Sequence, residues 1–214
     1  MSKIFAAGFV LAAFLFPSTQ FAQLLNPHGS NLEDAYQISY ASNLNLADGT
    51  VVVSNAGSAA GFYNASTSGN ICANIYVYAP DASLLSCCSC LAGPNSLHLW
   101  PVSYGPGNLL ANVPSSRLPT AVTIKLVSTS PLAGGGSCSP NSLSTSDLVP
   151  GMAAWGTRFH PTSAPVPALS ETKFIDKGLS LVELTKLNND CAILPVGQRC
   201  SDCITAGLAQ PTVP

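Results

Sequence analysis

Residues 71–90 read ICANIYVYAPDASLLSCCSC, and this stretch decides the fold class. Its first eight residues alternate, so that one face would carry Ile71, Ala73, Ile75 and Val77 and the other Cys72, Asn74, Tyr76 and Tyr78. A period of two with β-branched and aromatic residues predicts a β-strand. Pro80 and Asp81 are favoured turn residues, so we expect the chain to return through the cysteine-rich half as an antiparallel hairpin.

The hairpin gives the cysteines candidate partners. If the turn is centred on Asp81, residues equally far from it stand opposite each other, and Cys72 faces Cys90; a register shifted by two would pair Cys72 with Cys88 instead. Adjacent Cys87 and Cys88 point to opposite faces of a strand, so they need at least two partners.

Short apolar-alternating segments recur along the chain between turn-forming residues; they cover residues 50–55, 95–103, 120–128, 152–160 and 170–176. No long helical segments alternate with them, which argues against a parallel α/β fold. We therefore predict a mainly β fold, an antiparallel β-sandwich that is Ig-like or jelly-roll-like, with one short C-terminal helix and disulfides.

The helix is predicted after Ser180, because Glu183 stands at the spacing of a capping box. An apolar stripe of Leu181, Leu184, Leu187 and Cys191 follows, which favours packing against the sheet. We expect this helix to end around residues 188–190. Residues 128–147 lack periodicity and contain three consecutive glycines, which is typical of a surface loop or linker.

The first residues resemble a secretory signal peptide. Lys3 precedes an apolar run from Ile4 to Phe16, which is too short to span a hydrocarbon core of about 30 Å. We expect a secreted or periplasmic protein of the cell envelope, without membrane insertion after signal removal. The expected organisation is a signal peptide over 1–22, an N-terminal segment over 23–46, a single disulfide-stapled β domain over 47–207 and a tail over 208–214.

Eight cysteines are candidates for disulfides: Cys72, Cys87, Cys88, Cys90, Cys138, Cys191, Cys200 and Cys203. An even number in an exported chain indicates a disulfide framework. We expect Cys191 to pair with Cys200 or Cys203, and we assign no partner to Cys138. The two C-x-x-C pairs, 87/90 and 200/203, leave a zinc site as an alternative, although they are unusually far apart for one. A redox role would need a thioredoxin-like context that the pattern lacks.

Little in the sequence points to catalysis. Three histidines, His28, His98 and His160, stand singly, and no known catalytic motif accompanies them. We assign no catalytic, cofactor-binding or metal-binding residue and expect no cofactor. Asp48 lies in SNLNLADGT, a loose match to a calcium loop, but a turn with Gly49 explains it better.

The charge and the aromatic content of the chain narrow the range of partners to be expected. Charged residues make up 8% of the chain, against about 25% in typical proteins, and they are scattered, which excludes an electrostatic footprint for nucleic acid or anionic lipid. Asn64 begins an N-glycosylation motif that matters only in a eukaryotic secretory pathway. A carbohydrate platform would need several aromatics on one exposed face, although core packing is their more frequent fate; the candidates are Trp100, Trp155, Tyr63, Tyr76, Tyr78 and Tyr104.

Several stretches taken together resemble a family of exported proteins of the acidobacterial type that has no known activity. The matching segments are the SCCSC run at 86–90, the AWGTRFH run at 154–160 and the cysteine-rich end that includes RCSDC at 199–203. The resemblance implies a bacterial secreted protein with a shared disulfide framework, and it implies no active site.

We therefore expect an exported, disulfide-rich β protein that acts as a binding, surface or matrix component and not as an enzyme. Its partner is unassigned, with extracellular polysaccharide or protein as the candidates. One alternative is a secreted hydrolase that uses His98 or His160 with a distant acid. The other is a zinc-stabilised secreted protein.

Overall fold

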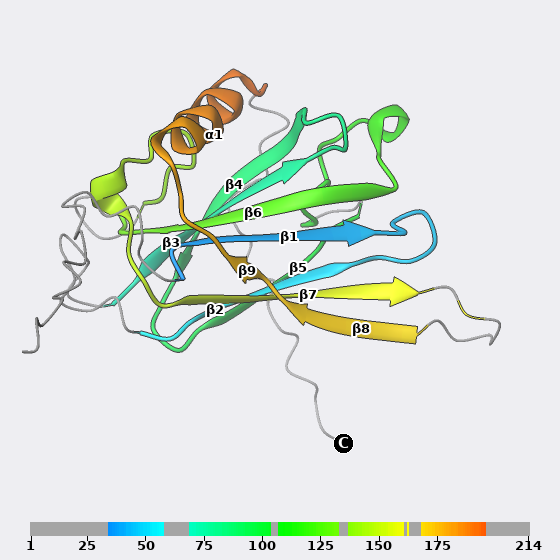
Figure 1. Cartoon of the computed structure of the whole chain (residues 1–214), viewed down its shortest axis with the longest axis horizontal. Coiled ribbons are helices and arrows are strands. Elements are labelled where there is room, and N and C mark those ends of the chain that lie inside the picture. Colours follow the sequence, from blue (N-terminus) through cyan, green and yellow to red (C-terminus); the bar gives the residue numbers. More distant parts are fainter. Residues whose placement is uncertain are drawn as a thin grey trace, which may run out of the picture.

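Two antiparallel sheets face each other in the computed structural model, which describes residues 34–57, 69–103, 107–132, 137–160, 162 and 168–195 (Figure 1). Sheet A has the order β4 (Leu84–Ala92), β3 (Ile71–Tyr78), β6 (Ala121–Thr129), β1 (Tyr36–Ser42) and β9 (Ile175–Asp176). Sheet B has the order β5 (Leu97–Pro101), β2 (Thr50–Asn55), β7 (Met152–His160) and β8 (Ala168–Lys173). The predicted mainly β, antiparallel fold with a C-terminal helix is thus confirmed.

The main core lies between the two sheets, and it uses the faces that alternation predicts. Ile71, Ala73, Ile75 and Val77 of β3 are all buried in it, as are Val122, Ile124 and Leu126 of β6. Sheet B contributes Val51, Val53, Trp100, Met152 and Ala154. Every second side chain of these strands therefore points toward the opposite sheet, as a sandwich requires.

A second cluster lies on the outer face of sheet A, under α1 (Leu181–Ile193), which crosses that face in Figure 1. Ser180 caps the helix as predicted, because its Oγ accepts from the backbone N–H of Glu183 at 3.1 Å. Leu184, Leu187 and Cys191 are buried against the sheet, but Leu181 is 67% exposed, so the predicted stripe was wrong at its first position.

The helix also runs past residues 188–190, where we expected it to end. Asn188 donates from Nδ2 to the Leu143 carbonyl at 2.8 Å and accepts from the Leu143 N–H at 2.9 Å. Asp190 accepts from the Tyr78 hydroxyl at 3.0 Å. Since these polar side chains bind neighbouring elements and do not compete for the helix backbone, the helix continues to Ile193.

The β3–β4 hairpin forms as predicted, but its register does not follow from its turn. Tyr78 opposes Leu84, as a turn centred on Asp81 requires, and the register then shifts between Val77 and Tyr78. Beyond this bulge Cys72 opposes Leu91, while Cys90 opposes Ala73. A slip of one residue moves a side chain to the other face, so the expected pairing of Cys72 with Cys90 or Cys88 was wrong.

Residues 36–42, which we placed ahead of the domain, form β1 inside sheet A between β6 and β9. Gln37 of this strand is fully buried, and its Nε2 donates to the Met152 carbonyl at 2.7 Å. On the same side of the molecule, Phe174 is the residue between β8 and β9. The chain therefore passes from sheet B to sheet A through one buried phenylalanine, which closes this side of the sandwich.

The segment 128–147, expected to be a loop or linker, packs onto sheet A over its described part. Leu143 and Leu148 belong to the cluster under α1. Thr145–Asp147 forms a 3-10 turn that Ser144 caps, and a second such turn, Ser115–Arg117, precedes β6. The segment therefore covers one face of the sandwich and does not separate two domains.

Candidate functional site

Two disulfides fasten α1 and segment 137–147, which together form the cover of sheet A. Cys72 bonds to Cys138, with their Cα atoms 5.6 Å apart, and Cys87 bonds to Cys191, with Cα atoms 5.8 Å apart. The expected pairing of Cys191 with Cys200 or Cys203 was therefore wrong, and the partner that the sequence left open for Cys138 is Cys72. The first bridge ties segment 137–147 to β3, and the second ties α1 to β4.

The remaining cysteines of the CCSC segment are also oxidised. Cys88 and Cys90 are disulfide-bonded and lie in the core between the sheets, whereas Cys87 lies under α1. Their partners lie outside the described residues, as do Cys200 and Cys203. Since zinc binding and thiol chemistry both need free thiolates, the C-x-x-C pair of Cys87 and Cys90 serves neither in this structure.

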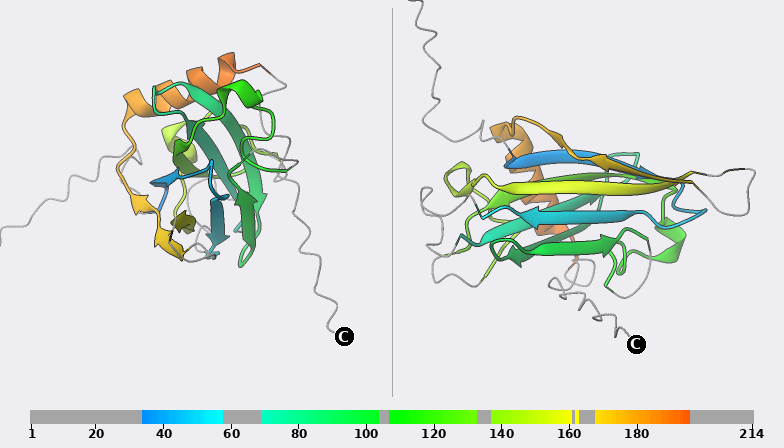
Figure 2. Two further views of the ribbon diagram at one scale, coloured as in Figure 1. Left: turned by 90° about the vertical axis from the view of Figure 1, so that its right-hand side faces the viewer. Right: turned by 90° about the horizontal axis from the view of Figure 1, so that it is seen from below.

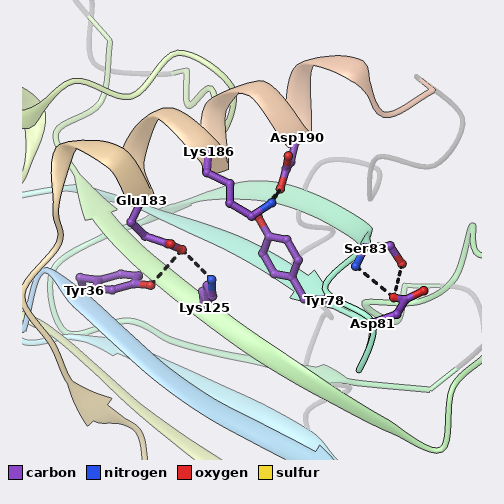
Figure 3. A network of polar contacts seen from close by, with 8 residues as sticks. All are labelled: Tyr36, Tyr78, Asp81, Ser83, Lys125, Glu183, Lys186 and Asp190. Carbon is purple, nitrogen blue, oxygen red and sulfur yellow. Dashed lines mark hydrogen bonds and ion pairs between the residues drawn. The ribbon is translucent and has the colours of Figure 1, made fainter.

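A polar network joins α1 to sheet A (Figure 3). Glu183 accepts from the Tyr36 hydroxyl at 3.3 Å and from Lys125 Nζ at 2.5 Å. About two turns further along the helix, Asp190 accepts from the Tyr78 hydroxyl and pairs with Lys186. Lys125 Nζ also lies 4.6 Å from the centroid of the Tyr78 ring, a cation–π distance. Each acid of the helix thus binds one tyrosine of sheet A, and Glu183 also pairs with Lys125 of β6, whereas the Lys186–Asp190 pair lies within the helix. The bonds to the sheet fix the helix in place.

The tyrosines of this interface stay protonated. Burial, followed by the charge of Glu183 and its hydrogen bond, raises the pKa of Tyr36 well above its usual value. Burial alone does the same to the pKa of Tyr76, and burial with the Asp190 hydrogen bond does so for Tyr78. At neutral pH these hydroxyls are hydrogen-bond donors and not bases.

An open pocket of about 380 Å³ lies where α1 ends. Ser83, Arg117, Lys186, Asp190 and Ile193 are among the residues that line it. Asp81 binds the backbone N–H and the hydroxyl of Ser83 at 3.0 and 2.7 Å, and these bonds, with Arg117, lower its pKa. Lys186 and Asp190, which line the pocket, are paired with each other, and Asp81 nearby is held by Ser83.

The described histidines lie beside serines. His98 Nε2 is 3.3 Å from Ser96 Oγ, its ring stacks on Trp100 with centroids 5.7 Å apart, and burial lowers its pKa. His160 Nε2 is 2.7 Å from Ser170 Oγ at an exposed position. His28 lies outside the described residues. In the part of the chain that the structure describes, no three His, Cys, Asp or Glu side chains are grouped as metal ligands would be.

Asp48 does not form the expected turn with Gly49, because the hydrogen-bonded turn starts at Asn43 and ends before Asp48. Its Oδ1 accepts from the backbone N–H groups of Val102 and Ser103 at 3.1 and 2.8 Å, and its Oδ2 accepts from the Ser103 hydroxyl at 2.7 Å. The carboxylate thereby fastens the loop before β2 to the end of β5.

The aromatic residues that were candidates for a carbohydrate platform separate in the fold. Tyr76 and Tyr78 share one face, as predicted, but that face lies under the cover of sheet A, where the Tyr76 hydroxyl donates to the Pro140 carbonyl at 2.5 Å. Trp100 is in the core, and Tyr63 and Tyr104 lie outside the described residues. Trp155 is different, because it points away from the core of sheet B.

The outer face of sheet B is the open surface of the described fold. Opposed residues of antiparallel strands share a face, so the register defines rows that run across the sheet. These rows are Leu97, Ser54 and Ala153; Leu99, Val52, Trp155 and Lys173; and Pro101, Thr50, Thr157 and Glu171. Leu97 is 57% exposed, Leu99 39%, and Leu169 on β8 60%. Figure 2 looks onto this sheet from below, with α1 on the far side.

Sequence alternation reveals which side chains share a face, but not which face is covered. Val52 and Trp155 have the alternation of any β-strand residue. Their exposure on an uncovered face follows only from the three-dimensional positions of both sheets and α1. This is why the sequence did not single out sheet B.

No family model, curated protein or solved structure matches this chain. Among the described residues, no helix has both the length and the apolar character needed to cross a membrane. The proposed function therefore has to be argued from the fold and its surfaces.

Proposed function

We propose that this protein is an exported, disulfide-stapled binding component of an extracellular surface or matrix, and that it contacts its ligand through the outer face of sheet B. The contrast between the two outer faces carries this proposal. Sheet A is covered by α1 and segment 137–147, which disulfides and a polar network hold in place. Sheet B presents large apolar side chains to solvent, and such patches on soluble proteins commonly mark interaction sites.

Export is supported by the oxidised cysteines, because disulfides persist in secreted and periplasmic compartments and are rare in the cytosol. The apolar run from Ile4 to Phe16 fits a signal peptide of a bacterial secreted protein, in line with the resemblance noted above.

The structural roles of the described histidines and acids favour a binding function over hydrolysis. Each ring lies beside a serine hydroxyl, a pair that a hydrolase would also use, but within the described residues no acid is hydrogen-bonded to either imidazole to orient it. Glu183, Asp190 and Asp48 hold elements of the fold together. The exposed leucines of sheet B have no such structural role.

The test measures adsorption of the full chain to insoluble extracellular material, with the outer face of sheet B altered. Leu97→Ser with Leu99→Ser replaces two exposed side chains and should weaken adsorption at least tenfold while the melting temperature stays within a few degrees. Val182→Ser is the matched control, because Val182 is 81% exposed on α1, and it should adsorb like the wild type.

Equal adsorption by all three proteins would contradict the assigned surface. Retention of the chain in the cytoplasm with reduced cysteines, after expression with residues 1–22 in a bacterial host, would contradict export.

A further inference from the structure

We infer that the ligand is a neutral polysaccharide, one strand of which lies flat across the outer face of sheet B with a sugar ring stacked on Trp155. This inference rests on the proposed function, since it names the ligand class of the same surface. Three properties of the surface support it: its charge, its size and the order of its side chains.

The first property is charge. On three of the four strands, β5, β2 and β7, every outward position in the rows is neutral: Leu97, Leu99, Pro101, Thr50, Val52, Ser54, Ala153, Trp155 and Thr157. Glu171 and Lys173 lie on the edge strand β8, and Lys173 is paired with Asp176 at 3.4 Å. The face is thus neutral except for the exposed carboxylate of Glu171 at its edge, so it does not attract polyanions and is suited to an uncharged polymer.

The second property is size. Four strands spaced about 4.8 Å apart make a strip roughly 14 Å wide, and six residues at about 3.3 Å each make it roughly 20 Å long. The plane of the strip therefore covers roughly 300 Å². A flat strip of this width and length can accommodate a single extended polymer strand.

The third property is the order of the side chains. Leu99, Val52 and Trp155 form the apolar part of a row that ends at Lys173 on the edge strand, and the indole is partly buried, so its neighbours support it. The electron-rich face of an indole attracts polarised C–H groups, which the flat faces of sugar rings present. An apolar row with an aromatic ring thus suits the ring face of a sugar.

The neighbouring row supplies hydroxyl groups. Thr50 and Thr157 oppose each other and their hydroxyls are hydrogen-bonded together, while Thr157 Oγ1 also accepts from the Thr50 N–H at 3.1 Å. A hydroxyl has one donor and two acceptor sites, so Thr50 retains capacity for a ligand. The two rows lie about 7 Å apart, two residues along each strand. A sugar polymer presents apolar ring faces and polar edges on this same scale.

The test uses affinity electrophoresis of the full chain in gels that contain one soluble polymer each: mixed-linkage β-glucan, galactomannan, dextran, or the polyanion alginate. We expect retardation by at least one neutral polymer and none by alginate. Trp155→Ala should weaken that binding about tenfold or more, Trp155→Phe should restore part of it, and Val182→Ala should leave it unchanged.

Fluorescence gives a second readout that does not depend on a variant. The sequence has two tryptophans, and Trp100 is 4% exposed in the core, so a soluble quencher should act mainly on Trp155. Bound polysaccharide should therefore protect the fluorescence from acrylamide.

Failure of any neutral polymer to bind, or equal binding by wild type and Trp155→Ala, would overturn the inference. If the wild type still adsorbs to extracellular material through Leu97 and Leu99, but protease treatment of that material abolishes adsorption, then the ligand is a protein and only the proposed function stands. A dimer in sedimentation that Trp155→Ala dissociates would assign the surface to a second copy of the chain and overturn the inference as well.

Discussion

Removal of the bridge between α1 and β4 should take away a large part of the stability of the domain. Cys87 and Cys191 are separated by 104 residues and both are fully buried. In the chain-entropy model, closing a loop of this length stabilises the fold by about 4.7 kcal/mol. The Cys72–Cys138 bridge shortens the effective loop to roughly 70 residues, which reduces the figure to about 4.4 kcal/mol. This is an upper figure, because the bonds of Cys88 and Cys90 also constrain the unfolded chain. Domains are stable by about 5–15 kcal/mol in total, so the loss would be a major fraction.

The double variant Cys87→Ala, Cys191→Ala leaves no unpaired thiol at either position. Guanidinium denaturation, followed by far-ultraviolet circular dichroism, should show unfolding free energy lowered by about 4 kcal/mol. The matched control is Cys72→Ala with Cys138→Ala, whose loop of 66 residues predicts a loss of about 4.3 kcal/mol. Both losses are upper figures, because the bonds of Cys88 and Cys90 remain in each variant and constrain its unfolded chain.

Limited proteolysis separates the two variants. Lys186 lies in α1, and the Cys87–Cys191 bridge attaches this helix directly to β4. Trypsin should cut after Lys186 faster in the variant that lacks this bridge than in the control variant. A stability loss below 1 kcal/mol, or equal cleavage at Lys186 in both variants, would refute the reasoning.

Two further predictions concern buried polar groups. Because burial raises the pKa of Tyr76 above its usual value near 10, this tyrosine stays neutral in the fold but ionises in the unfolded chain above that pH. The stability that Tyr76 contributes should thus be complete below about pH 10 and be lost at higher pH by up to about 1.4 kcal/mol per pH unit, and Tyr36 and Tyr78, whose pKa values are raised too, add to the fall. Tyr76→Phe should make urea midpoints between pH 8 and 11.5 fall less steeply, and an unchanged slope would count against this. Asn55 of β2 donates to the carbonyls of Gly69 and Ala92 at 2.9 Å each and accepts from the Gly57 N–H at 2.8 Å. Asn55→Ala should lower the unfolding free energy by about 2–3 kcal/mol in the same denaturation assay, and a loss under 1 kcal/mol would contradict the role of these bonds.

Local patterns predicted most of the strands, because alternation is a property of each segment alone. β2 coincides with the predicted 50–55, and β7 with 152–160. β1 was missed because YQISYAS alternates weakly, with a buried glutamine at a core position. Its place in sheet A comes from tertiary contacts, such as the bond from Gln37 to Met152, which no short window contains.

The disulfide pairing could not be predicted from the sequence for a related reason. One bulge next to the β3–β4 turn reversed the face on which Cys72 was expected relative to Cys90. The true partners, Cys138 and Cys191, come from segments 66 and 104 residues away. The same limit applies to the open face of sheet B, since a strand's sequence does not say which of its two faces another element covers.

If the protein is exported, as proposed above, the order of its cysteines along the chain has a consequence for its maturation. Cys72, Cys87, Cys88 and Cys90 would then leave the translocation channel first, and none of them is bonded to another of the four in the folded protein. Any bond that an oxidant makes among them before Cys138 and Cys191 emerge is therefore non-native. Maturation then depends on thiol–disulfide exchange, so a disulfide isomerase should raise the rate of oxidative refolding, and a rate that is indifferent to the isomerase would argue that folding itself delays oxidation.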